Sequence, residues 1–182
     1  MTTDVVAEQI GWMDGIFTHA ENRNLFDDEE QLAIQSELSN RWVKENRLEL
    51  LNDLRERFGE AAVFTVIDKI IDSNCRRDWE QIGKEKDNSL ENFIKILWEP
   101  LQESGFEYSF EKEGNSIKFR VTKCPMYDLA REIGAEKWFY HLLCLTDGPT
   151  VEGFNSRIEF NRTRTLMQGY ADCNHCYTEL SS

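Results

Sequence analysis

The sequence contains few residues that break regular structure and no long hydrophobic run. Proline occurs 3 times and glycine 10 times in 182 residues, while 40% of the residues are hydrophobic. This composition excludes a collagen-like chain and disfavours intrinsic disorder. The longest apolar stretches, residues 61–64 and 142–145, are far shorter than a membrane span. Acids rather than Lys or Arg occupy the first 15 residues, so the sequence predicts a cytoplasmic protein with neither a secretory signal nor membrane contact.

Positive charge is also scarce. The chain carries 21 Lys and Arg against 34 Asp and Glu, a formal net charge of −13. The imbalance decreases along the chain, from −8 in residues 1–60 to −4 in residues 61–119 and −1 in residues 120–182. An acidic chain without a basic stripe lacks the surface that neutralises phosphates. This excludes nucleic acid as a partner and disfavours anionic membranes.

Apolar residues with helical spacing dominate the first hundred residues. Those within residues 6–17 recur at intervals of four, three and four, which predicts a helix. Acids at its start favour a second helix, predicted as one long segment over residues 27–58. Two more helices are expected, one over residues 60–72 or beyond and one over residues 88–104. Ser89 is expected to cap the start of the second of these helices.

After residue 105 the spacing changes to that of strands. Apolar and polar residues alternate over 106–110 and over 117–121, and Gly114-Asn115 between them suits a turn, so a β-hairpin is predicted. Two short helices and two further strands are expected in the rest of the chain: helices over 128–133 and 135–145, and strands over 157–166 and from Gly169 to 177–180.

These patterns predict an α+β fold, in which an antiparallel sheet of about four strands is packed with helices and preceded by a helical N-terminal region. The expected division is a helical region over 1–104 and an α+β, cysteine-containing domain over 105–182, unless the two form one integrated domain. A homodimer through the long helix around Trp42 is a further expectation.

Four of the five cysteines lie in the last 59 residues. In a cytosolic chain they are expected to be reduced, and to act chemically, bind metal or pack in the core. Cys124 precedes Pro125, which suits the first turn of a helix. The positive end of that helix, together with Lys123, is expected to lower the pKa of the Cys124 thiol. Cys144 and Asp147 are three residues apart at a helix end, so they are expected to face the same side.

Three interpretations of this region compete. One cysteine is a nucleophile, with Asp147 or His175 moving protons and an arginine holding a substrate carboxylate. Alternatively, Cys173, Cys176 and His175, together with Cys144 or Cys124, bind zinc, although strand alternation would place Cys176 on the opposite face from Cys173 and His175. In the third interpretation these residues only pack. The same alternation predicts that Arg162 and Arg164 share one side of a strand and that Thr163 and Thr165 share the other.

The order of these motifs resembles that of the L-2-amino-thiazoline-4-carboxylic acid hydrolase family. The resemblance covers roughly residues 105–180, and its matching stretches are Cys124-Pro125, Cys144-Leu-Thr-Asp147, Phe160-Asn-Arg162-Thr163-Arg164-Thr165-Leu166-Met-Gln-Gly169 and Asp172-Cys173. It implies hydrolytic ring opening of a small cyclic amidine, 2-aminothiazoline-4-carboxylate, to S-carbamoyl-cysteine. A cysteine would attack the ring carbon, or a base would activate water to do so.

The resemblance also implies roles for individual residues. The catalytic candidates are Cys124, Cys144, Asp147, Cys173 and His175. The candidates for binding the small-molecule substrate are Asn155, Arg162, Thr163, Arg164 and Asp172. No cofactor is expected for this hydrolase. A looser similarity, to the 4-vinyl reductase type of small-molecule-binding domain, implies instead a non-catalytic sensor that holds a ligand, or zinc at Cys144, Cys173 and Cys176.

Overall fold

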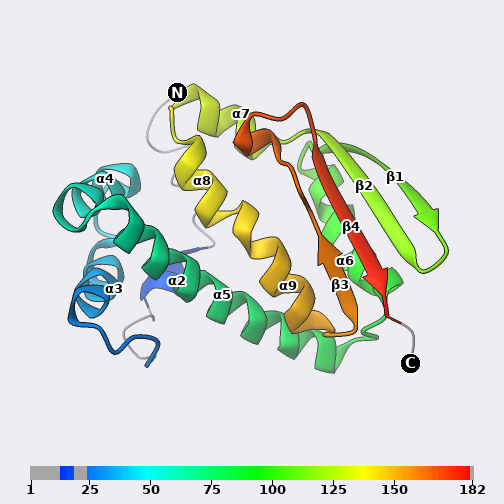
Figure 1. Ribbon diagram of the computed structural model, residues 1–182, viewed down its shortest axis with the longest axis horizontal. Helices are drawn as coiled ribbons and strands as arrows, with labels where there is room; N and C mark the ends of the chain where they lie inside the picture. Colours follow the sequence, from blue (N-terminus) through cyan, green and yellow to red (C-terminus); the bar gives the residue numbers. More distant parts are fainter. Residues whose placement is uncertain (1–12, 19–23, 181–182) are drawn as a thin grey trace. The chain divides into compact units, whose positions relative to one another are not determined.

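The computed structural model describes residues 13–18 and 24–180 (Figure 1). It has the predicted α+β class, with a four-stranded antiparallel sheet and many helices. Contacts group the chain into two compact units, residues 1–74 and 75–182. The predicted domain boundary at residue 105 stays a prediction. No helix of the described ranges combines the length and the hydrophobicity that crossing a bilayer requires.

The first unit contains helices only among its described residues: α2 (Asp14–Thr18), α3 (Glu29–Arg41), α4 (Arg47–Phe58) and the first part of α5 (Glu60–Glu85). The second unit contains the rest of α5, followed by α6 (Leu90–Glu103), β1 (Glu107–Glu113), β2 (Ser116–Lys123), α7 (Pro125–Glu132), α8 (Glu136–Leu142), η3 (Cys144–Thr146), α9 (Asp147–Phe154), β3 (Ile158–Asn161), η4 (Leu166–Gln168) and β4 (Cys173–Glu179).

The single helix predicted over residues 27–58 is wrong, because α3 and α4 are separate helices. The Asn46 side chain caps α4, accepting hydrogen bonds from the backbone N–H groups of Leu48 and Glu49 at 3.1 and 3.2 Å. Gly59 ends α4 as expected, with a φ of 81° that favours glycine. The predicted helix over residues 6–17 lies largely outside the described residues, which include only its end in α2.

Trp42 is a core residue of the first unit. Its side chain is fully buried, its ring centroid lies 4.3 Å from that of Phe17, and its indole N–H donates to the Asp14 carboxylate at 3.2 Å. Arg47 donates to the same carboxylate at 2.5 Å. Trp42 therefore has an intramolecular role, and the homodimer expected through it stays a prediction.

The sheet has the strand order β1-β2-β4-β3, and all of its pairs are antiparallel. The predicted hairpin is confirmed: Phe110 pairs with Phe119, and Gly114 adopts a φ of 59° in the turn. β3 is shorter than the strand predicted over 157–166. The Asn174 side chain accepts from the backbone N–H groups of Thr163 and Arg164 at 3.1 and 2.9 Å, so a side chain takes the place of the strand ladder there.

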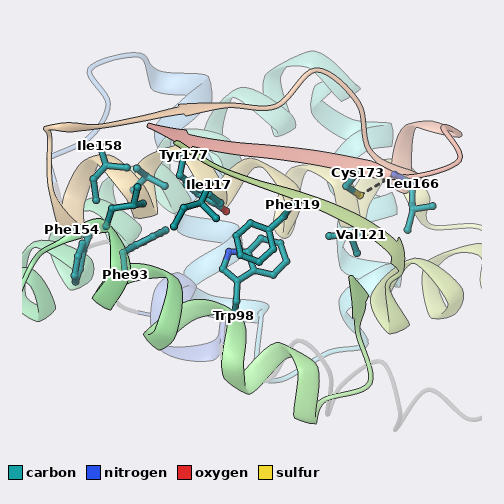
Figure 2. Packing of buried hydrophobic residues seen from close by; sticks show 12 residues of the cluster. Phe93, Trp98, Ile117, Phe119, Val121, Phe154, Ile158, Leu166, Cys173 and Tyr177 are labelled. Atoms are coloured by element: carbon teal, nitrogen blue, oxygen red, sulfur yellow. Dashed lines mark hydrogen bonds between the residues drawn. The ribbon is translucent and has the colours of Figure 1, made fainter. Parts of the chain in front are cut away.

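One face of the sheet packs on α6 and α9 around a core of aromatic rings (Figure 2). Trp98 of α6 stacks on Phe119 of β2, with ring centroids 4.0 Å apart and an interplanar angle of 10°. On β4 the side chains alternate as predicted. Cys173, His175 and Tyr177 are buried on the core side, whereas Cys176 faces the other way and is only partly buried.

Candidate active site

The carboxylate of Asp147 is the centre of a cluster of charged and polar side chains that could take part in a reaction. Asp147 begins α9, directly after η3, and its side chain is 23% exposed. Its Oδ2 atom accepts a hydrogen bond from Arg162 Nη1 and lies 3.2 Å from His175 Nε2. No hydrogen bond from the described residues engages the other oxygen, Oδ1. One oxygen of the Asp147 carboxylate is thus fixed by hydrogen bonds, and the other is open in the sense that none of the described residues donates to it.

Arg162 reaches Asp147 because it lies one residue beyond the end of β3. Its Nη2 atom donates to the Cys144 carbonyl oxygen at 2.9 Å, and its side chain is only 9% exposed. Burial is the largest single influence on the pKa of Arg162 and by itself lowers it. The Asp147 carboxylate, together with Cys144, Tyr140 and Cys173, outweighs burial, so the pKa is raised. The site therefore carries a permanently charged and immobilised arginine.

His175 approaches Asp147 from the core side of β4. Its side chain is 10% exposed, and its ring lies 5.1 Å from that of Trp98 and 5.9 Å from that of Phe160, measured between centroids. A carboxylate can only accept hydrogen bonds, so Nε2 must carry the proton that faces Asp147. His175 and Arg162 together fix the orientation of the carboxylate.

Three thiols lie near this centre. Cys124 and Cys173 are both close enough to Cys144 to interact with it electrostatically, as are Asp147 and Arg162. Burial and the Asp147 charge raise the pKa of Cys144, and burial raises that of Cys173, whose sulfur accepts from the Leu166 backbone N–H at 3.2 Å (Figure 2). All five cysteines are free thiols.

The lowered pKa predicted for Cys124 is wrong. Burial raises the pKa of this thiol to about 11, and the nearby backbone N–H groups of Tyr127 and Met126 at the start of α7 offset only part of that rise. Lys123 does not assist, because its ammonium pairs with the exposed Glu107 carboxylate at 3.0 Å. Desolvation therefore outweighs the helix N-terminus at this position.

Arg164 joins a second cluster that does not include Asp147. Its Nε atom donates to Asp172 Oδ1 at 2.5 Å, and Arg120 Nε donates to Asp172 Oδ2 at 2.8 Å. These hydrogen bonds, from Arg164 first and then Arg120, lower the pKa of Asp172. The prediction that Arg162 and Arg164 share one side is wrong, because the chain has left the strand ladder before Arg164.

Two other candidate residues have structural contacts instead. The Asn155 side chain donates to the Asn88 carbonyl oxygen at 2.8 Å and accepts from the Arg157 backbone at 2.9 Å, which ties the end of α9 to the loop before α6. Thr163 is exposed and accepts from the Asn174 side chain at 2.9 Å. Neither residue has a hydrogen bond to the Asp147 centre.

The residues proposed for zinc do not converge. Cys176 lies on the opposite face of β4 from Cys173, as the alternation indicated. Within residues 13–18 and 24–180, no three His, Cys, Asp or Glu side chains are arranged to hold a metal ion. Zinc binding therefore has no geometric support from the described residues and stays an untested alternative.

Two contributors to these clusters were not singled out from the sequence. Arg120 meets Asp172 only because β2 and β4 pair in a register that places Arg120 opposite Asn174. Tyr140 of α8 is close enough to Arg162 to interact with it electrostatically. Strand register could have indicated the first, but Tyr140 lies in an ordinary helical pattern that gives no functional signal.

Fold and site together define an α+β protein in which Asp147, Arg162 and His175 form a partly buried cluster near thiols whose pKa values burial raises. The chain belongs to the L-2-amino-thiazoline-4-carboxylic acid hydrolase family, whose model matches residues 39–177. Comparison with curated proteins and with solved structures gives no significant match. The matched range includes the whole Asp147 centre.

Proposed function

We propose that the protein is a hydrolase that opens a ring C–N bond in a small cyclic amidine bearing a carboxylate, with L-2-aminothiazoline-4-carboxylate as the substrate to test first. The observation that carries this proposal is the Asp147 carboxylate, held at Oδ2 by Arg162 and His175 and open at Oδ1. An oriented carboxylate with one available oxygen suits a group that takes a proton from water. The family name supports the substrate class.

In the proposed reaction the oxygen of a water molecule forms a bond with the amidine carbon, and a proton from that water passes to Asp147 Oδ1. The ring nitrogen receives the electron pair of the C=N double bond and takes this proton from Asp147. The remaining C–N single bond then breaks while the new hydroxyl group gives its proton, through Asp147, to the same nitrogen, so that a carbonyl group and a primary amine are formed. The product is S-carbamoyl-cysteine, which equals substrate plus water. His175 and Arg162 hold the carboxylate in place, and the Arg162 charge attracts the substrate carboxylate.

Water is favoured over a cysteine as the nucleophile by the state of the thiols. The thiolate is the reactive form of cysteine. With a pKa of about 11, Cys124 is almost entirely protonated at neutral pH, and burial and the Asp147 charge raise the pKa of Cys144 as well. These thiols therefore form a neutral lining beside the acid–base centre.

The proposal is tested by turnover of L-2-aminothiazoline-4-carboxylate, with the product identified by mass spectrometry. Asp147→Asn is expected to lower kcat by at least about a hundredfold, the usual contribution of a positioned base. Glu152→Gln is the control, because this exposed carboxylate also lies on α9 and also pairs with an arginine, Arg76, but is not one of the candidate residues. Its kcat should stay close to that of the unmodified protein.

Substitution of the thiols separates the two nucleophiles. Cys124→Ser and Cys144→Ser should each retain most of the activity if water attacks. Loss of turnover in either folded variant would instead identify that cysteine as the nucleophile. If the folded, reduced protein binds the substrate without converting it, the proposed hydrolysis is wrong and the ligand-binding sensor becomes the better interpretation.

A further inference from the structure

Three buried polar atoms belong to His175 and to two aromatic side chains whose rings neighbour it. They are Nε1 of Trp98, Nδ1 of His175 and the hydroxyl of Tyr177, in side chains whose residues are 3%, 8% and 0% exposed. None of the three forms a hydrogen bond with the described protein. An unsatisfied buried polar atom is costly, so three of them in adjacent side chains require an explanation.

These atoms belong to neighbouring rings on the core face of the sheet. The ring centroid of Trp98 lies 5.1 Å from that of His175 and 6.4 Å from that of Tyr177, and the latter two lie 6.5 Å apart. Figure 2 shows the Trp98 indole nitrogen on α6 turned toward the hydroxyl end of Tyr177. Burial and the Asp147 charge raise the pKa of Tyr177, and the approach of the Trp98 indole N–H to the Tyr177 hydroxyl counters part of this rise as a weak hydrogen bond would. In distance and angle this approach falls short of a well-formed hydrogen bond.

The donors and acceptors at this position define what can satisfy them. Because the Nε2 proton of His175 faces Asp147, Nδ1 of the neutral ring is an acceptor. The Trp98 indole can only donate, and the Tyr177 hydroxyl can do either. A single group that reaches all three must therefore both donate and accept. A carboxylate cannot donate to Nδ1, and a metal cation cannot accept from the indole.

We propose that Trp98, His175 and Tyr177 hold one internal water molecule, and that Trp98 and Tyr177 are positioning residues that act through it on His175. The water accepts from the Trp98 indole, donates to His175 Nδ1 and forms its third hydrogen bond with Tyr177, which is the usual number for a buried water. His175 is thereby kept as the tautomer with its proton on Nε2, aimed at Asp147. The catalytic consequence rests on the proposed function, whereas the water site does not.

The sign of a stability change tests the site without any substrate. If the Tyr177 hydroxyl is satisfied by water, Tyr177→Phe loses a hydrogen bond, and the Tm should fall by roughly 2–4 °C for a chain of this size. Tyr108→Phe is the matched control, because that hydroxyl donates to the Trp98 carbonyl oxygen at 3.0 Å in the same core, and its Tm should fall by a similar amount. A higher Tm in Tyr177→Phe would show a hydroxyl without a partner and overturn the proposal.

Nuclear magnetic resonance of the full chain then observes the water directly. The Trp98 indole proton, identified by its loss in Trp98→Phe, should show dipolar transfer from a long-lived water. The ¹⁵N resonances of His175, identified by their loss in His175→Gln, should show Nε2 protonated and Nδ1 accepting a hydrogen bond. The Nδ1 resonance should move in Trp98→Phe and Tyr177→Phe but not in Tyr108→Phe. An indole without water contact, or a proton on Nδ1 of the neutral ring, overturns the proposal.

Kinetics separate the water site from the proposed reaction. Tyr177→Phe should lower kcat by about tenfold with an unchanged KM, the effect of one lost hydrogen bond on an acting group, whereas Tyr108→Phe should not. Equal kcat values for Tyr177→Phe and the unmodified protein would overturn the positioning role. If no protein turns over the substrate while the resonances and the Tm behave as expected, the proposed function fails and the water site stands.

Discussion

Desolvation is the dominant influence on the cysteines of this protein. Cys124 precedes a helix, a position that commonly produces a reactive thiolate, yet burial raises its pKa to about 11. Cys144 and Cys173 are shifted in the same direction by the same cause. At the scale of single residues, therefore, how deeply a thiol is buried matters more here than the element beside it.

The first prediction is slow alkylation of Cys124 in the native protein. At pH 8 a thiol with a pKa of about 11 is only about one part in a thousand thiolate, against roughly a quarter for an ordinary cysteine. Iodoacetamide should modify Cys124 more than about a hundred times more slowly than free cysteine, as followed by peptide mass spectrometry. The urea-unfolded chain is the control and should react at all five cysteines. A native rate equal to that of free cysteine would contradict the assigned burial.

The second prediction concerns how the free energy of unfolding changes at acid pH. Hydrogen bonds from Arg164 and Arg120 lower the pKa of Asp172 in the folded state, so this carboxylate stabilises the fold fully above its unfolded pKa, near 3.9. The contribution is lost as the pH falls through the lower, folded pKa. Asp172→Asn should therefore lower the free energy of unfolding at pH 7, and its difference from the unmodified protein should shrink below about pH 4. Urea titrations at a series of pH values measure both; a difference that grows toward low pH would show the opposite sign.

At the scale of elements, the sequence predicted an element's boundary correctly where the residue that sets this boundary lies within or next to the element. Ser89 begins α6, and Gly114 marks the hairpin turn, because a cap and a turn act within a few residues. The break between α3 and α4 was missed because Asn46, its only strong marker, lies among helix-forming charged residues. β3 was predicted too long because the competing group, the Asn174 side chain, is ten or more residues away along the chain.

The residues of the candidate site were predictable from the sequence, but their partners and their burial were not. Asp147, Arg162 and His175 were all singled out from residue type and spacing, and the structure brings them together. The partner of each arginine was not predictable, because it depends on where the β3 ladder ends. Thiol burial was also beyond the sequence, since it is set by packing between segments far apart in the chain.

The third prediction uses the close approach of α5 and α9. A Cβ atom added at Gly153 would lie 2.5 Å from the Arg76 carbonyl oxygen and 2.8 Å from its Cα, so the backbones would have to separate. Gly153→Ala should destabilise the fold by about 1–3 kcal/mol. Gly148→Ala in the same helix is the control: its Cβ would meet nothing within 4 Å, and alanine should be neutral or stabilising by up to about 1 kcal/mol. Urea unfolding of both variants measures the contrast, and equal stabilities would argue against the tight helix contact.

For the whole molecule, excess negative charge is the main electrostatic feature. The net charge is −13, with −8 of it in residues 1–60. In that region Arg41 gathers three carboxylates, donating to Glu37 at 2.9 Å and to Glu45 and Asp53 at 2.7 Å. The hydrogen bonds to Glu45, Asp53 and Glu37 raise the pKa of Arg41. One cation thus offsets repulsion among several acids at a place where the surplus is greatest.

The last prediction follows from the competition between this local attraction and the repulsion of the whole chain. Exposed ion pairs contribute only about 0–1 kcal/mol each, whereas a large net charge destabilises the compact state through every pair of like charges. Salt screens both, so raising NaCl from about 20 mM to about 500 mM should increase the Tm, because relief of repulsion outweighs weakening of the pairs. Arg41→Gln removes a cation and its three pairs at once. Its Tm should therefore be lower than that of the unmodified protein at low salt, and the difference should narrow as salt is added. A Tm that falls with salt in the unmodified protein would mean that the ion pairs, and not the repulsion, dominate its electrostatics.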